Sequence, residues 1–292
     1  MDSNKKLTTA EKMFGSCEWT KVYFDEEAVN LGHLVIVKDT QGLSYILEQC
    51  LGHGFEGEVW KVRRLDQDQQ PWGPELALKF EIGDVDIGKQ LKSEYDLLVS
   101  LDHPYIIKPV KYWFSPMFGP DDIDINRGHM LTYFIKGPHI DKAELNSEES
   151  RQAILDLITV LRYLNLTIKI YHGDLKADNV ILTQIDQLKY PIVIDFGFPG
   201  PIEDHPYIDR KALGLIYLQL IGLSDDLVNQ FKKNMGWHGN MNKLYSPVET
   251  EQAISSITRL RSQQLTILQS FFDGTTHNDL YELVKTSHWF KI

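Results

Sequence analysis

The chain has 292 residues and carries 30 basic against 41 acidic side chains, which gives a formal net charge of −11 at pH 7. This length predicts two lobes or domains with room for a sizeable core, and the acidic balance argues against nucleic acid as a partner because it repels polyanions. No apolar run approaches the roughly 18 residues that cross a bilayer, so we expect no membrane span, and the amino terminus lacks the apolar stretch of a Sec-type signal peptide.

The first predicted elements are an extension and three strands. Residues 1–43 show neither a sustained helical period nor alternation, so we expect an extension packed on the body. From Tyr45, apolar residues lie on both sides of a glycine cluster, which indicates strand, tight turn and strand over 45–64. A polar hairpin loop at 66–74, marked by Pro and Gly, leads to a further strand at 75–82. A β-rich region therefore begins at Tyr45.

A helix and two more strands complete this region. Apolar residues from Leu91 to Leu101 recur at helical spacing, and the helix should end near Pro104, because proline disfavours helix in the residue before it. Two strands joined by a turn-rich loop are then indicated, the strands at 106–114 and 129–137 and the loop at 118–128. We therefore expect a small lobe of strands with one helix.

The character of the chain changes to helical after Gly137. Asn146 and Glu149 have the spacing of a capping box, although Ser147 could equally be the cap, and apolar residues then follow at helical steps. Two short strands, a helix and a mostly helical pattern come next, at 179–183, 190–196, 212–222 and onward to residue 292. The predicted fold class is α+β, with an extension over 1–43, a β-rich lobe over 44–136 and an α-helical lobe over 137–292.

The cysteines carry little chemistry. Cys17 and Cys50 are the only two in the chain, too few for a disulfide-stapled scaffold or a thiolate zinc site. We expect two buried or idle thiols in a reducing compartment, since free cysteine commonly behaves as a small buried hydrophobe.

The first motif with possible chemistry is a glycine string between two predicted strands. Gly52, Gly54, Gly57 and Val59 form the pattern G-x-G-x-x-G-x-V. Glycines here would let backbone N–H groups close over phosphates without a Cβ in the way. The string precedes a strand, so it is not a dinucleotide-binding fingerprint, which must open a helix. A glycine-rich hairpin without a ligand is the alternative.

A lysine in the middle of a predicted apolar strand is the second feature. Lys79 follows Ala77 and Leu78, and its burial would be costly without an anionic partner. A nucleotide phosphate and Glu94, on the helix that follows, are the two candidates. The alternative is a snorkelling surface lysine beside a solvated glutamate.

The third feature is a polar loop followed by the end of an apolar strand. Asp174, Lys176 and Asn179 lie within the loop, and Asp195 ends the strand. A carboxylate to receive a hydroxyl proton, a lysine to neutralise a transferring phosphoryl group and an Asn/Asp pair to hold magnesium form a complete set for phosphoryl transfer. His172 is interpreted as a core histidine that holds the loop by a hydrogen bond.

These motifs resemble the signature set of the eukaryotic-type protein kinase domain, from Tyr45 to the carboxyl terminus. The resemblance implies a bilobal fold that binds ATP and Mg²⁺, with Mn²⁺ as a possible substitute. In it, Asp174 would be the catalytic base and Lys176 the phosphate-facing lysine typical of Ser/Thr kinases. Asp209, with Leu213 and Gly214, resembles the start of the buried helix that anchors the catalytic loop.

The resemblance also implies the residues that hold the nucleotide and the metal. Lys79 would contact the α- and β-phosphates and pair with Glu94, while Asn179 and Asp195 would ligate Mg²⁺. The remaining contacts fall on the phosphate-covering glycines, the residues around the adenine and the hinge, namely Gly52, Gly54, Gly57, Val59, Ala77, Ile181, and Tyr133 and Ile135 within 132–135.

Departures from the family pattern concern its regulation. Gly173 stands where the family usually has arginine, so the group that reads a phosphorylated activation loop is missing. Asp195 and Asp209 are separated by so few residues that the activation segment is expected to be essentially deleted. Glu56, where phenylalanine is usual, places negative charge near the phosphates. Such shortened kinases resemble the effector kinases that some bacteria inject into host cells, and some viral kinases.

Three functions are consistent with these features. The leading hypothesis is an ATP-dependent protein Ser/Thr kinase without activation-loop control, located in the cytoplasm, or in the host cytosol if it is a secreted effector. A small-molecule kinase is the second, because His-Gly-Asp-Leu and the short following loop also resemble aminoglycoside and choline phosphotransferases. A kinase-fold binding scaffold is the third. A protein substrate could dock through the helical lobe or the extension, and an allosteric activator is possible.

Overall fold

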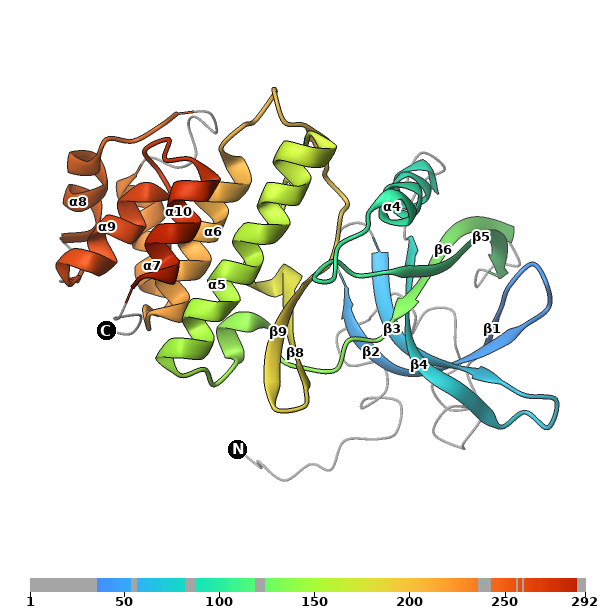
Figure 1. Ribbon diagram of the computed structural model, residues 1–292. Coiled ribbons are helices and arrows are strands. Elements are labelled where there is room, and N and C mark those ends of the chain that lie inside the picture. Colours follow the sequence, from blue (N-terminus) through green and yellow to red (C-terminus); the bar gives the residue numbers. More distant parts are fainter. Residues whose placement is uncertain are drawn as a thin grey trace, which may run out of the picture. The chain divides into compact units, whose positions relative to one another are not determined.

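The computed structural model describes residues 36–53, 57–81, 88–118, 124–235, 243–255, 257–258 and 260–287. The chain divides into two units, one of Met1–Leu101 and Ile107–Phe134 and the other of Asp102–Ile106 and Ile135–Ile292. The first is built on a sheet and the second mainly from helices (Figure 1). We call them the strand-rich unit and the helical unit. The expected α+β class, with strands first and helices after them, is confirmed.

The strand-rich unit contains a curled antiparallel sheet and helix α4 (Figure 1). The strand order is β1-β2-β3-β4-β6-β5. Helix α4 contacts β4, β5 and β6, and the ring of Tyr95 on α4 lies 5.8 Å from that of Tyr112 on β5. The bounds are β1 Ile36–Lys38, β2 Ser44–His53, β3 Gly57–Leu65, β4 Pro71–Glu81, α4 Gly88–Ser100, β5 Pro109–Phe118 and β6 Asp124–Tyr133.

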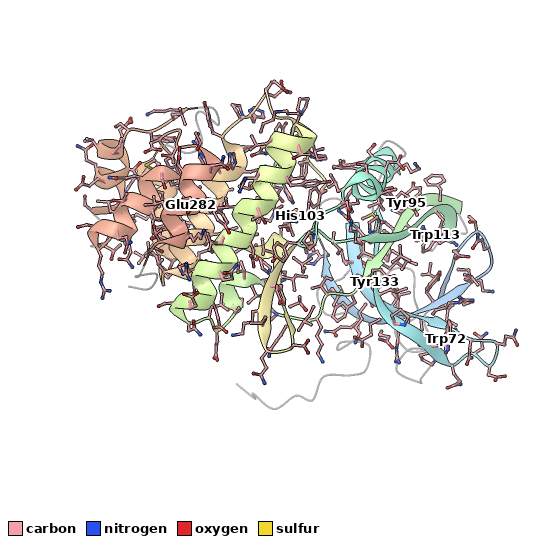
Figure 2. All side chains as sticks on the ribbon, in the orientation of Figure 1. Trp72, Tyr95, His103, Trp113, Tyr133 and Glu282 are labelled. Atoms are coloured by element: carbon pink, nitrogen blue, oxygen red, sulfur yellow. The ribbon has the colours of Figure 1, made fainter. Side chains whose placement is uncertain are left out.

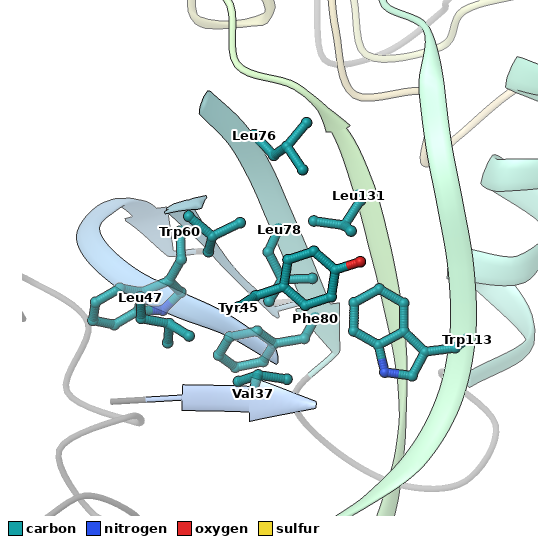
Figure 3. Close-up of a cluster of buried hydrophobic side chains, with 10 residues drawn as sticks. Val37, Tyr45, Leu47, Trp60, Leu76, Leu78, Phe80, Trp113 and Leu131 are labelled. Atoms are coloured by element: carbon teal, nitrogen blue, oxygen red, sulfur yellow. The ribbon is translucent and has the colours of Figure 1, made fainter. Parts of the chain in front are cut away.

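Alternation along β4 separates the core of this unit from its functional face. Leu76, Leu78 and Phe80 are buried, and successive side chains of a strand point to opposite faces, so Ala77 and Lys79 lie on the other side of the sheet. The core cluster draws on all six strands of the sheet (Figure 3); its members are Val37, Tyr45, Leu47, Trp60, Val62, Leu76, Leu78, Phe80, Trp113 and Leu131.

The sheet extends further than the sequence pattern indicates. Ile36 to Lys38, within the predicted extension, form β1 and pair with β2. Strands β5 and β6 remain paired as far as Phe118 and Asp124, so residues 124–128, predicted as loop, belong to β6. That part of the loop prediction is wrong. Strand pairing uses backbone N–H and C=O groups, so a polar stretch can continue a hairpin without any apolar signal.

Cys50 also differs from its expectation. The residue is disulfide-bonded, so the prediction of an idle thiol at this position is wrong. Two cysteines can pair wherever the fold brings their Cα atoms within about 7 Å, and a count of cysteines carries no information on that distance.

The helical unit begins its main helix at a fully formed capping box. The Asn146 side chain accepts hydrogen bonds from the amides of Glu148 and Glu149, and the Glu149 carboxylate accepts one from the Asn146 amide. Asn146 is therefore the N-cap, and Ser147 is the first helical residue. Helix α5 (Ser147–Arg162) packs against α6 (Ile208–Leu220), α10 (His277–Lys285) and β9 (Leu188–Val193).

The other elements of the helical unit are short. Its strands form two antiparallel pairs among the described residues, β8 with β9 and β7 with β10. Across the part of the chain that the structure describes, no helix is both long and apolar enough to cross a membrane. The remaining bounds are η1 Ile140–Lys142, η2 Tyr163–Ile168, β7 Ile170–Tyr171, η3 Ala177–Asn179, β8 Val180–Ile185, β10 Gly200–Pro201, α7 Asp225–Asn234, α8 Pro247–Ser255 and α9 Ser262–Ser270.

Candidate active site

In the strand-rich unit, the predicted lysine and glutamate form an ion pair. Lys79 Nζ on β4 lies 2.8 Å from Glu94 Oε2 on α4. The Glu94 side chain is 3% exposed and that of Lys79 16%, so neither is a solvated surface group. The pair therefore joins α4 to the middle of the sheet, and the interpretation of Lys79 as a snorkelling surface lysine does not hold.

Two of the predicted adenine-contacting residues lie beside this lysine. Val59 on β3 is the direct cross-strand partner of Lys79, and Ala77 is two residues before Lys79 on β4. All three side chains therefore share one face of the sheet. Tyr133 ends β6 and is 52% exposed (Figure 2).

Ile181, predicted to lie beneath the adenine, and Ile135, predicted as a hinge residue, belong to the helical unit. Ile181 lies in β8, where it forms an isolated bridge with His139. The structure thus gathers Val59 and Ala77 at Lys79 within the strand-rich unit, and it places these two isoleucines on the other unit.

The glycines of the string have different reasons to be glycine. A Cβ at Gly57 would lie 2.1 Å from the Phe80 carbonyl oxygen of β4, so strand packing alone requires glycine there. A Cβ at Gly52 would meet nothing within 4 Å, so packing gives no reason for glycine at that position. Gly54 and Glu56 lie outside the described residues. Strand packing therefore explains why residue 57 is glycine, but it does not explain why residue 52 is glycine.

In the helical unit, the loop after β7 gathers the predicted catalytic groups. Asp174 Oδ2 accepts hydrogen bonds from Lys176 Nζ at 2.6 Å and from Asn179 Nδ2 at 3.0 Å. Asn179 Nδ2 also donates to the Asp174 carbonyl oxygen at 2.8 Å. Because the amide nitrogen of Asn179 is committed to Asp174, its oxygen Oδ1 is the atom suited to ligate a cation.

Asp195 is held next to this loop by the backbone. The Ile194 amide donates to the Asn179 carbonyl oxygen at 3.0 Å, and Asp195 itself has φ of 62°, in the left-handed region that Asp tolerates better than most residues. Burial opposes the charge of Lys176, but its hydrogen bond with Asp174 and the charges of Asp174, Asp195 and Asp178 outweigh that effect and raise the pKa of Lys176. Lys176 therefore stays protonated at neutral pH.

The buried carboxylate of Asp209 anchors this loop. Asp209, in the first turn of α6, accepts the His172 amide at 2.7 Å and the Gly173 amide at 3.0 Å. Burial raises the pKa of Asp209, although the hydrogen bonds that Asp209 accepts act in the opposite direction. These bonds fix the two residues that precede Asp174.

His172 links the loop to the strand that ends at Asp195. Its Nδ1 accepts the Asp174 amide at 3.3 Å, so Nε2 carries the ring proton and donates to the Ile194 carbonyl oxygen at 3.1 Å. Its ring also lies 4.5 Å from that of Phe196. The interpretation of His172 as a core histidine that holds the loop is consistent with these contacts.

Gly173, which replaces the usual arginine, has a steric reason to be glycine. Its φ is +88°, and a Cβ there would lie 2.1 Å from the Phe198 carbonyl oxygen. The chain beyond Phe198 continues into β10, where Gly200 and Pro201 pair with Tyr171 and Ile170 of β7. The segment after Asp195 therefore packs directly on the catalytic loop.

We expect Gly173→Ala to lower the free energy of unfolding by about 2–4 kcal/mol, since it adds a steric clash with backbone to left-handed strain. Gly222→Ala is the matched control, because Gly222 has φ of +110° but a Cβ there would meet nothing within 4 Å. That variant should lose only about 1–2 kcal/mol. Denaturant unfolding of both variants measures the difference, and equal losses would contradict the packing role.

A cavity of about 480 Å³ opens beside the catalytic loop within the helical unit. Residues 173–178 of the loop line it together with α6, α7 and the η1 residues Asp141 and Lys142, and Leu215 and Val228 are among the lining side chains. The amphipathic pattern of α7 is that of any surface helix, so it does not by itself predict a cavity there. The cavity is large enough for a side chain or small ligand next to Asp174.

The donor atoms of Asn179 and Asp195 suit magnesium. An amide oxygen and a carboxylate are the hard oxygen ligands that Mg²⁺ prefers, and Mg²⁺ is usually held by one or two protein groups together with phosphate oxygens and water. Among the described residues, no three or more His, Cys, Asp or Glu side chains gather in a way that could hold a metal alone. The donor atoms of Asn179 and Asp195 therefore fit a magnesium site completed by such oxygens.

Comparison with known proteins agrees with this geometry. Residues 45–214, more than half of the chain, match the family described as the protein kinase domain. The chain is 24% identical over 187 residues to the serine/threonine-protein kinase AtPK1/AtPK6 of Arabidopsis thaliana, covering 62% of this chain and 37% of that protein. It is 27% identical over 177 residues to CBL-interacting protein kinase 28 of Oryza sativa subsp. japonica, covering 59% and 36%.

A third relative is the serine/threonine-protein kinase tousled-like 1 of Homo sapiens, 26% identical over 183 residues, with 56% of this chain and 21% of that protein covered. The chain thus spans little more than a third of the length of the first two relatives, and less of the third. The matched region, residues 45–214, contains both the Lys79–Glu94 pair and the loop that carries Asp174.

Proposed function

Because the chain belongs to the protein kinase family, we propose that it transfers the γ-phosphoryl group of ATP to serine and threonine hydroxyls of proteins, with Mg²⁺ or Mn²⁺ as the metal. The observation that carries this proposal is the hydrogen-bonded group on the catalytic loop. Asp174, Lys176 and Asn179 combine a carboxylate base, a protonated lysine and an amide ligand within one short segment. Phosphoryl transfer needs all three, whereas a scaffold needs none.

Each side chain has a defined task in this proposal. Asp174 accepts the proton of the acceptor hydroxyl. As that proton leaves, the hydroxyl oxygen bonds to the γ-phosphorus, and the bond between the γ-phosphorus and the oxygen that departs with ADP breaks. Lys176, which the structure shows on Asp174 Oδ2, must leave that oxygen for the phosphate before the proton can move there. Asn179 and Asp195 would hold the metal, and a bound metal would neutralise phosphate charge.

The strand-rich unit supplies a second cation. Lys79, oriented by Glu94, would contact the α- and β-phosphates and so hold the nucleotide in position. Position matters because the loose transition state of phosphoryl transfer leaves little covalent chemistry for the protein, and alignment with electrostatic stabilisation supplies most of the rate.

We further propose that this kinase works without phosphorylation of an activation loop. Two observations support this: Gly173 packs on the Phe198 carbonyl oxygen, and β10 pairs with β7 through backbone hydrogen bonds. Neither contact needs a phosphate. Protein substrates would dock on the helical unit, whose cavity borders Asp174. A cytoplasmic location, or the host cytosol for a secreted effector, remains a prediction.

A transfer assay with defined acceptors and metals tests the proposal. We expect the full chain to move ³²P from [γ-³²P]ATP to a mixture of casein and histones, and not to choline or aminoglycosides. Excess EDTA should stop transfer, and Mg²⁺ or Mn²⁺ should restore it, because the amide of Asn179 and the carboxylate of Asp195 cannot offset the negative charge of the triphosphate without the cation. Transfer at an unchanged rate in EDTA, or to the small molecules alone, would contradict the proposal.

A further inference from the structure

A buried glutamate outside the predicted site connects three elements of the strand-rich unit. Glu81 ends β4, two residues after Lys79, and is 4% exposed. Its Oε1 accepts the amide of Leu91, in the first turn of α4, at 2.9 Å, and its Oε2 accepts the amide of Gly128, on β6, at 3.3 Å. The two carboxylate oxygens thus tie the end of β4 to a helix and to a neighbouring strand.

This contact lies beside the Lys79–Glu94 ion pair. Lys79 and Glu81 are two residues apart on β4, so they share one face of the sheet. Leu91 and Glu94 are three residues apart on α4, so they are neighbours on the helix surface. Helix α4, which Figure 1 shows alongside β5 and β6, is therefore fixed to β4 at two adjacent points.

The surroundings of Glu81 are shaped for a carboxylate. A Cβ at Gly128 would lie 2.6 Å from Glu81 Oε2, so only glycine leaves room for that oxygen. Arg127 Nη1 donates to the Glu81 carbonyl oxygen at 2.7 Å, which fixes the backbone of the same residue. The first turn of α4 has no acidic residue of its own, and a negative charge near a helix N-terminus is stabilising.

A second observation separates Glu81 from an ordinary core residue. Burial raises the pKa of Glu81, although the amides of Leu91 and Gly128 and the charges of Lys79 and Arg127 act in the opposite direction. An apolar side chain of similar size would avoid the desolvation of a buried carboxylate. The residue is therefore better explained by what it positions than by burial of surface.

We propose that Glu81 is a positioning residue that holds α4 at the distance where Glu94 reaches Lys79. Its consequence for catalysis rests on the proposed kinase function, in which the lysine–glutamate pair must be in place for transfer. All the groups involved lie within the strand-rich unit. The pair therefore forms through contacts internal to that unit.

The first test reads the contact itself and needs no enzymatic activity. In the full chain, Glu81→Leu should speed hydrogen exchange of the Leu91 amide about tenfold, as expected for one lost hydrogen bond, and should speed acylation of Lys79 by an amine-reactive reagent about threefold. Gly128→Ala, which displaces the carboxylate without removing it, should act in the same direction. Glu75→Gln, on the same strand, is the control and should change neither.

The second test asks whether Glu81 acts through Glu94. We expect Glu81→Leu to lower kcat about tenfold and to cause no further loss in a Glu94→Gln background, because effects transmitted through one contact are not additive. Glu81→Gln, which keeps one acceptor oxygen, should recover part of the rate. A merely structural role would give the same tenfold loss in both backgrounds.

Each of the two tests can fail without the other. Wild-type exchange at Leu91 and wild-type reactivity of Lys79 in Glu81→Leu would overturn the positioning role, whether or not the chain is a kinase. A chain without transferase activity would overturn the proposed function, while the exchange and acylation measurements would still decide whether Glu81 holds α4.

Discussion

Asp174→Asn should lower the rate of phosphoryl transfer to protein about 10³-fold while leaving the fold unchanged. Asparagine has nearly the same shape, and its Oδ1 can still accept the hydrogen bonds that Lys176 and Asn179 donate to Asp174 Oδ2. It cannot accept a proton from the acceptor hydroxyl. Steady-state transfer from labelled ATP measures the loss, and circular dichroism with thermal unfolding confirms that the variant is folded.

The matched control for this variant is Asp226→Asn. Asp226 is an exposed carboxylate in the first turn of α7 and does not line the cavity beside Asp174. Its removal changes the net charge by the same amount, so it should retain the wild-type rate within about twofold. If Asp174→Asn retained its rate as well, another group would have to accept the proton.

Asp209→Ala should lower both the stability and the activity of the protein. The substitution removes the acceptor of the buried His172 amide and of the half-buried Gly173 amide, and each such loss costs about 1–3 kcal/mol. We expect the free energy of unfolding to fall by about 3 kcal/mol, with a loss of activity of about 10²-fold because the loop that carries Asp174 is no longer anchored. Denaturant unfolding and the transfer assay measure the two losses.

Asp209→Asn separates the hydrogen bonds from the charge. The amide oxygen can accept one of the two backbone amides, so this variant should lose about half as much stability as the alanine variant. Wild-type stability in Asp209→Ala would mean that the two loop amides find other acceptors, and the anchoring role would then be wrong.

The catalytic loop could be predicted from the sequence because its functional residues lie close together in the chain. Asp174, Lys176 and Asn179 lie within six positions of each other, and the structure joins them by hydrogen bonds that such a spacing permits. Lys79 was equally accessible, because a lysine in an apolar strand needs a partner, and Glu94 lay on the next predicted helix. In both cases the residue types and their spacing were enough to predict which side chains interact.

Other features depend on contacts between distant parts of the chain. The departure at Gly173 was visible in the sequence, but its reason, the carbonyl oxygen of Phe198, is not. Glu81 lies on the same strand as Lys79, and nothing in the sequence pattern pairs it with Leu91 and Gly128. The pairing of residues 124–128 within β6 likewise depends on backbone groups that every non-proline residue carries.

The most direct measurement of the central claim is the phosphoamino-acid content of proteins after incubation with the full chain, [γ-³²P]ATP and Mg²⁺. We expect phosphoserine and phosphothreonine, formed at a rate that Asp174→Asn lowers about 10³-fold. Label found only in inorganic phosphate or in small-molecule acceptors, or protein label that Asp174→Asn forms at the wild-type rate, would contradict it.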